Sequence, residues 1–188
     1  MDWNGHVEIT RAASVIADGG VIAYPSEAVW GLGCDPFREA AVNKILEIKQ
    51  RPVSKGLILI GSSLDGFYSY LVGLEPKYRR LFSIPRSQPT TWLVPDNGFA
   101  PRWIVGNHAT VALRLSSHPV VAALCNSFGG PIVSTSANPQ GLPAATTQTK
   151  VEEYFAANLG FCAPGKVAGA SRESEIINLL TGEVIRPG

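Results

Sequence analysis

Charged residues are scarce in this sequence. Of its 188 residues, 16% are Asp, Glu, Lys or Arg, against roughly 25% in an average globular protein. Sixteen basic and fifteen acidic residues leave a formal net charge of +1, so no field of one sign covers the molecule. Because 45% of the residues are hydrophobic, the chain is not an intrinsically disordered one. Binding that relies on overall charge is excluded, and any basic site must be local.

Long apolar runs and paired cysteines are also missing. No run reaches the roughly 18 apolar residues that a membrane span needs, and Asp2 and Glu8 stand where a signal peptide carries basic residues. We therefore expect a cytoplasmic protein with no membrane partner. Cys34, Cys125 and Cys162 are far apart and form no CxxC pair, so we expect neither a disulfide framework nor a metal site built by the protein.

Segments of helical and strand periodicity alternate along the chain, which predicts a single α/β domain over residues 1–188. Gly and Pro break these segments, and residues 160–174 form a Gly-, Ala- and Ser-rich stretch that we interpret as a mobile loop. We expect helices at 6–18, 38–50, 119–128 and 151–158, strands at 21–24, 57–60, 91–94, 110–115 and 131–134, and a hairpin of 176–180 with 183–185.

One nucleotide-binding motif can be dismissed. Residues 160–166, GFCAPGK, have P-loop spacing, but Val167 occupies the position of the Ser or Thr that would bind magnesium.

A cluster of cations stands where the predicted helix 38–50 ends. Lys49, Arg51 and Lys55 lie within seven residues, interrupted by Pro52. They are either a solvated cap on the helix C-terminus or part of an anion site. We favour the anion site because residues 24–33, YPSEAVWGLG, follow a strand with small residues and two glycines that permit close approach of a ligand.

Hydroxyl and amide side chains follow another predicted strand, at Ser134–Asn138. They are suited to binding anionic oxygens, or they form a turn that satisfies its own backbone. Arg114 interrupts an apolar strand, so its charge needs an anionic partner. That partner is either a ligand or an acid such as Glu27.

These motifs together resemble the YrdC/TsaC family. The resemblance implies a twisted mixed sheet with flanking helices around a deep basic cavity, in the short single-domain bacterial form. It also implies a nucleotidyltransferase that makes threonylcarbamoyl-AMP and pyrophosphate from L-threonine, bicarbonate and ATP, for threonylcarbamoyladenosine in tRNA. The matching runs are YPSEAVWGLG at 24–33, KQRP at 49–52 with KGLI at 55–58, VALR at 111–114 with HP at 118–119, STSAN at 134–138 and IRPG at 185–188.

The resemblance also implies roles for individual residues. Lys49 and Arg51 would be catalytic, and Mg²⁺ would accompany ATP. The product would pass to a tRNA-modifying transferase complex, and weak RNA binding is a further expectation. The residues matching the ATP side are Lys49, Arg51, Lys55, Thr110, Ser136, Asn138, Ser174 and Arg186, and those matching the threonine side are Ala28, Arg114 and Ser134.

Several positions depart from the family pattern or keep two interpretations. Ser26 and Ala28 stand where relatives carry Thr, Ile60 replaces a polar residue, and residues 86–89, RSQP, replace a Trp-Pro-Gly-Pro turn. Glu27 is either a magnesium contact or an orienter of Arg51. We expect His118, just before Pro119, to have a structural role at a helix start, with acid–base work as the alternative.

Two other classes of function compete with the enzyme. A non-catalytic RNA-binding module would use the same basic cavity without ATP, but the chain has neither RNP aromatics nor a KH-type clamp. A subunit that only docks in a tRNA-modifying assembly would need a large exposed apolar patch.

Overall fold

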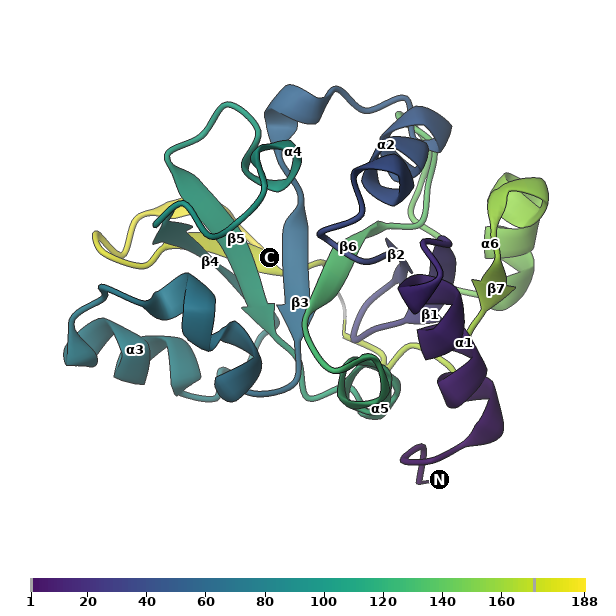
Figure 1. The fold of residues 1–188 in the computed structure, drawn as a ribbon, viewed down its shortest axis with the longest axis horizontal. Helices are drawn as coiled ribbons and strands as arrows, with labels where there is room; N and C mark the ends of the chain where they lie inside the picture. The colour runs from purple at the N-terminus through teal and green to yellow at the C-terminus, as the bar shows by residue number, and fades with distance from the viewer. Residues whose placement is uncertain (1, 171) are drawn as a thin grey trace.

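A twisted mixed sheet forms the centre of the fold, as expected (Figure 1). The computed structural model describes residues 2–170 and 172–188, and within them nine strands pair in the order β7-β1-β2-β6-β3-β5-β4-β8-β9. The sheet contains parallel pairs, such as β3 with β5, and antiparallel pairs, such as β4 with β5. The strands are β1 (Ile22–Pro25), β2 (Trp30–Gly33), β3 (Ile58–Gly61), β4 (Thr90–Pro95), β5 (Thr110–Leu115), β6 (Ile132–Ser136), β7 (Phe161–Cys162), β8 (Glu175–Asn178) and β9 (Val184–Arg186).

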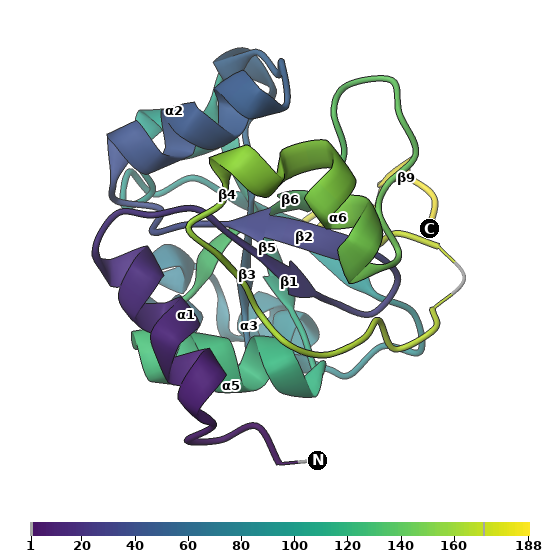
Figure 2. The same cartoon turned by 90° about the vertical axis from the view of Figure 1, so that its right-hand side faces the viewer.

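Helices cover both faces of this sheet, because neighbouring strand residues point to opposite faces. Leu59 packs in the same cluster as residues of α2 and α3, whereas the next residue, Ile60, packs with α1 and α5. Figure 2 shows α1 and α5 side by side. The α-helices are α1 (Val7–Ala17), α2 (Glu39–Ile48), α3 (Pro76–Ser83), α4 (Arg102–Val105), α5 (Pro119–Phe128) and α6 (Gln148–Phe155). Among the described residues, no helix is both long and apolar enough to cross a membrane.

The expectation that residues 24–33 leave a strand is wrong for residues 30–33, although Trp30 and Gly31 do line a cavity. Residues 30–33 are strand β2, which pairs with β1 on one side and β6 on the other. A Cβ atom added at Gly33 would lie 2.8 Å from both the Val133 carbonyl oxygen and the Tyr24 ring. This glycine therefore allows close packing inside the sheet, where the sequence pattern suggested close approach of a ligand.

The chain reverses sharply after α2. Gln50 has a positive φ of 52°, and a 3₁₀ turn follows at Val53–Lys55. Gly56 also has a positive φ, and a Cβ there would lie 2.8 Å from the Val105 carbonyl oxygen. The backbone N–H of Leu57 donates to the Ile104 oxygen. Contacts with α4 thus fix the cationic segment between α2 and β3.

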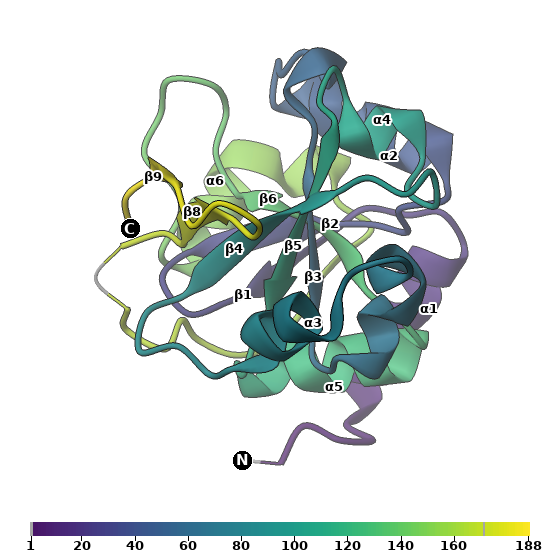
Figure 3. The ribbon, with the colours of Figure 1, turned by 90° about the vertical axis from the view of Figure 1, so that its left-hand side faces the viewer.

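Several elements lie in segments for which no helix or strand was predicted. Helix α3, the short α4 and the 3₁₀ helix Asp65–Leu71 all fall between predicted strands. The C-terminal hairpin is confirmed: β8 and β9 pair antiparallel beside β4 (Figure 3). Residues 160–170 are not a free loop, because β7 pairs with β1, and the N–H groups of Ala168 and Ala170 donate to the backbone of Ser26 and Glu27. Ser171, also in the segment interpreted as a loop, lies outside the described residues.

Candidate functional site

A cavity of about 300 Å³, here named the first cavity, opens on the same face of the sheet as α1 and α5, over strand residues that these two helices do not cover. Its floor is a row of residues in register across β6, β3, β5 and β4, namely Ser134, Ile58, Ala112 and Leu93, of which only Ser134 is polar. Basic side chains from Arg51, Lys55, Arg114 and Arg186 surround this floor. Among the described lining residues, Glu173 contributes the single carboxylate.

Nine of the eleven residues predicted to bind ATP or threonine line this one cavity. They come from six separate segments of the chain, so the fold brings together positions that are far apart in the sequence. They are Ala28, Arg51, Lys55, Thr110, Arg114, Ser134, Ser136, Ser174 and Arg186. The depth and overall charge of the cavity, and the role of each lining residue, remain predictions.

Lys49 and Asn138 do not line the cavity but lie behind it. The Lys49 ammonium donates to the backbone oxygens of Ser136 and Asn138, the latter at 2.8 Å, and to Asn138 Oδ1 at 3.2 Å. Burial, together with the positive charge of Arg51, lowers the pKa of Lys49 to about 8. Ser136 Oγ also donates to Asn138 Oδ1. For Asn138, the alternative interpretation as a self-satisfied turn therefore matches the structure.

Two guanidinium groups, those of Arg51 and Arg186, line the first cavity. Arg51 donates to the Gly56 carbonyl oxygen at 3.0 Å, and burial followed by the charge of Arg186 lowers its pKa. Arg186 donates to the Ser174 oxygen at 2.6 Å and pairs with Glu173 at 3.4 Å. Because two like charges in a partly buried place repel each other, an anion between them would be stabilised.

Arg114, a charged residue within an apolar strand, has an anionic partner in Glu27. Its Nη2 forms an ion pair with Glu27 Oε2, and Ser116 Oγ donates to Glu27 Oε1 at 2.7 Å. Of the two roles left open for Glu27, orienting Arg51 is wrong for this structure, because the partner of Glu27 is Arg114. Ile60, one of the departures from the family pattern, is buried in register with Arg114.

His118 has the structural position expected of it, at the entry of α5. Its Nε2 lies 3.0 Å from the Lys166 carbonyl oxygen, so the ring ties the segment after β7 to α5. Burial lowers the pKa of His118, which favours the neutral ring.

The first cavity also contains residues that sequence reasoning missed. His108 and Glu173 both line it. Neither stands in a motif nor follows an apolar run that would predict burial, so only their placement in the fold brings them to the site.

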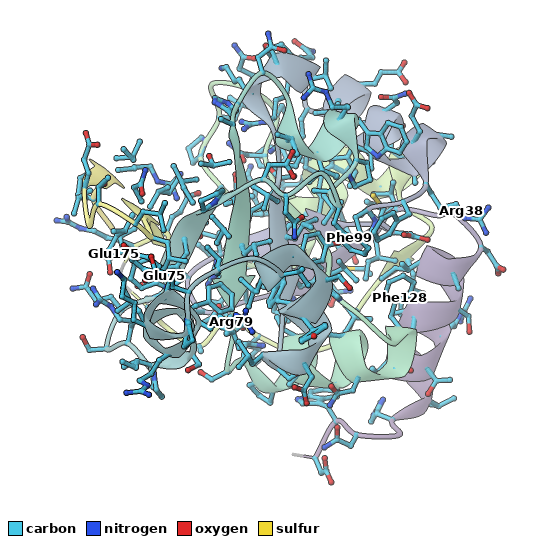
Figure 4. All side chains as sticks on the ribbon, turned by 60° about the vertical axis from the view of Figure 1, so that its left-hand side comes forward. Arg38, Glu75, Arg79, Phe99, Phe128 and Glu175 are labelled. Atoms are coloured by element: carbon cyan, nitrogen blue, oxygen red, sulfur yellow. The ribbon has the colours of Figure 1, made fainter. Side chains whose placement is uncertain are left out.

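A second cavity, of about 540 Å³, lies on the other side of the Glu27–Arg114 pair. Glu27 and Ser116 line it together with the turn at 85–89 and residues 168–170. Arg86, which departs from the family turn, donates to Glu175 at 3.2 Å, and Glu175 is the first residue of β8 in the C-terminal hairpin (Figure 4). The Glu27–Arg114 pair therefore lies between the two cavities.

Comparison with known proteins decides the family. The family profile Sua5_yciO_yrdC, described as "Telomere recombination", matches residues 14–188. The chain belongs to this family. Relatives named threonylcarbamoyl-AMP synthase are 48% identical in Cellvibrio japonicus, covering 100% of this chain and 99% of the relative, and 47% identical in Stutzerimonas stutzeri, covering 99% and 98%.

Solved members of the family share the fold. The crystal structure of P. abyssi Sua5 complexed with L-threonine has a TM-score of 0.88 and 31% identity, covering 96% of this chain and 54% of that one. The chain thus spans about half the length of that protein. E. coli YciO matches in fold at 23% identity, with a TM-score of 0.78 over 95% of this chain and 87% of that one.

Proposed function

We propose that this protein is a threonylcarbamoyl-AMP synthase, which transfers the adenylyl group of ATP to the carbamate of L-threonine. The observation that carries the proposal is the convergence of nine predicted ligand-binding residues on the first cavity. Full-length relatives named for this activity, at about half identity, support it.

The cationic end of the first cavity is suited to the nucleotide phosphates. Arg51 and Arg186 face the same space, and Lys55 lines it from the 3₁₀ turn. Ser136 and Thr110 add hydroxyl groups from β6 and β5, and Ser174 Oγ lies 2.8 Å from Thr91 Oγ1. In this assignment Lys49 acts from behind, holding the backbone of Ser136 in place.

The opposite end of the first cavity is suited to L-threonine. Arg114 is 8% exposed and is borne on a central strand, so its guanidinium has little freedom to move. A guanidinium fork binds a carboxylate with directed hydrogen bonds. Ser134 lines the same space and would bind the threonine hydroxyl, while the small side chain of Ala28 would leave room for the γ-methyl group.

The reaction requires positioning and charge stabilisation. The threonine amine combines with bicarbonate to form a carbamate and water. A carbamate oxygen then attacks the α-phosphorus, and the bond from that phosphorus to the bridging oxygen breaks to release pyrophosphate. Arg51 and Lys55 would stabilise negative charge that grows on the phosphate oxygens, and the apolar floor would exclude water.

Mg²⁺ is proposed to enter with ATP. Within the described residues, no group of three His, Cys, Asp or Glu side chains is arranged to hold a metal ion. The phosphate oxygens of ATP would therefore supply most of the ligands, and Glu173, which lines the first cavity, is the carboxylate that fits beside them. The bound ion would neutralise charge on the departing pyrophosphate.

A tRNA-modifying transferase complex is the proposed consumer of the product, and weak RNA binding and a cytoplasmic location complete the proposal. Release of pyrophosphate by purified protein tests the enzymatic core of this function. We expect release that requires ATP, L-threonine and bicarbonate together. Pyrophosphate release that continues when threonine is omitted, or no release with all three present, would contradict it.

A further inference from the structure

Glu27 links its own segment, which follows β1, to two other segments of the fold. Its carboxylate accepts hydrogen bonds from Arg114 of β5 and from Ser116, just past the end of β5. Its backbone oxygen accepts one from Ala170. Arg114 and Ser116 are two residues apart and so point to the same side of the strand, where one carboxylate reaches both.

Ser116 keeps the Glu27 carboxylate in place. Ser116 is 4% exposed, its N–H donates to the Gly61 oxygen, and its Oγ also accepts from the His118 N–H. Because one Glu27 oxygen is held by this fixed hydroxyl, only the other oxygen is available to Arg114. The contact between Glu27 and Arg114 is therefore made by a single guanidinium nitrogen, Nη2.

This arrangement leaves Arg114 with spare donors. Among the described residues, Nε of Arg114 is buried and has no hydrogen-bond partner, which is costly for a donor of this kind. The side chain lines the first cavity. A buried donor without a partner, on a guanidinium that faces a cavity, points to an anionic ligand group as the missing partner.

We propose that Glu27 is a positioning residue for the substrate carboxylate. Held by Ser116, it fixes Arg114 through Nη2, so that the remaining N–H groups of the guanidinium face the α-carboxylate of the amino-acid substrate. This inference rests on the proposed function, because it assigns that carboxylate to Arg114. Glu27 touches no substrate and acts through Arg114 alone.

The position of the ion pair between the two cavities determines the side from which a ligand can reach Arg114. Arg114 lines the first cavity and Glu27 lines the second, so the pair stands between them. A substrate carboxylate therefore reaches Arg114 from the side opposite Glu27, and it adds to the Glu27 contact without displacing it.

Steady-state kinetics of Glu27→Ala test the proposal. We expect the KM for L-threonine to rise about tenfold or more, while the KM for ATP changes less than about twofold, because paired groups couple strongly and distant ones do not. The variant Glu27→Ala/Arg114→Ala should match Arg114→Ala in threonine KM, since Glu27 has no effect without Arg114. The double variant also removes both buried charges together, so it should fold better than either single variant, which leaves one charge unpaired.

Glu175→Gln is the matched control. Glu175 accepts hydrogen bonds from Arg86 and Thr90, which repeats the Arg–Glu–hydroxyl arrangement outside the first cavity. We expect this variant to keep the threonine KM of the wild type. Should Glu27→Ala fail to fold, Glu27→Gln preserves the shape and removes the charge, and its threonine KM should still rise about threefold or more.

Three results would overturn the proposal. The first is an unchanged or lowered threonine KM in the folded Glu27 variants, the second an equal rise in the ATP KM, and the third a further loss when Glu27→Ala is added to Arg114→Ala. Calorimetric titration of L-threonine into wild-type protein separates this failure from that of the proposed function. Wild-type protein that neither binds threonine nor turns over contradicts both, whereas binding that is equal in wild type and Glu27→Ala contradicts the positioning role alone.

Discussion

Lys49 and Asn138 join the end of α2 to the end of β6: the ammonium group donates to the Asn138 backbone oxygen at 2.8 Å and to its side-chain oxygen at 3.2 Å. This contact changes what a lysine in the KQRP motif is expected to do. The Lys49 ammonium supports the backbone behind the proposed phosphate site, and the residue is only 6% exposed.

The lowered pKa of Lys49 predicts a pH dependence. With a pKa of about 8, the ammonium loses its proton as the pH rises through 8, and the charge behind the phosphate site disappears. We expect kcat/KM for ATP, measured at saturating threonine and bicarbonate, to fall above about pH 8. Lys49→Arg keeps its charge, so its decline should begin at a higher pH. Identical pH profiles for the two proteins would assign the decline to another group.

Arg51→Ala is expected to lower kcat/KM for ATP strongly. A single electrostatic donor that meets developing charge contributes about 2–4 kcal/mol to transition-state stabilisation, or roughly 30- to 1000-fold in rate. Arg38 is an exposed arginine outside the first cavity, and Arg38→Ala is the matched control. Equal activity of Arg51→Ala and Arg38→Ala would remove Arg51 from the mechanism.

Selectivity for threonine over serine is expected to be moderate. One methyl group in an apolar pocket contributes about 1–3 kcal/mol to discrimination. Ala28 is buried and lines the first cavity at the end proposed for threonine, so Ala28→Val should reduce kcat/KM for threonine more than for serine. The two amino acids are compared by pyrophosphate release. A ratio that stays constant in the variant would place the methyl group elsewhere.

His118 predicts a loss of stability in acid. Burial lowers its pKa below the usual value of about 6.5, so the folded state resists protonation more than the unfolded state does. Its contribution to the free energy of unfolding is therefore complete above pH 6.5 and is lost as the pH falls through the folded-state pKa. Urea denaturation at pH 7.5 and pH 5 should show a smaller loss for His118→Gln than for wild type. An equal loss in His118→Gln and in the wild type would assign the loss of stability to other groups.

The sequence predicted most strands because their periodicity is strong. The apolar run Leu57–Ile60 is typical of an interior strand, and β3 (Ile58–Gly61) does lie between β6 and β5. Strand β2 was not predicted because glycines such as Gly31 and Gly33 are more typical of loops. In the structure they allow the strand to pack closely against Tyr24 and β6. The anchoring of residues 160–170 depends on backbone hydrogen bonds to residues 21–27, and backbone bonds of this kind cannot be predicted from the pattern of side chains.

Some features of the candidate site could also be predicted from the sequence, and others could not. Arg114 was predictable as a cation in need of a partner, because a charge inside an apolar strand is costly. The choice of Glu27 as that partner depends on Ser116 and on the meeting of β5 with the segment after β1. That meeting is a property of tertiary structure, which spacing along the chain does not encode.

Incorporation of labelled bicarbonate tests the central claim most directly. Purified protein is incubated with ATP, L-threonine and ¹³C-bicarbonate, and the nucleotide products are separated and weighed by mass spectrometry. The proposed function predicts an AMP derivative that contains threonine and a single ¹³C atom, and none when threonine is replaced by buffer. An AMP–threonine product without the labelled carbon, or AMP alone with no adduct at any time, would contradict it.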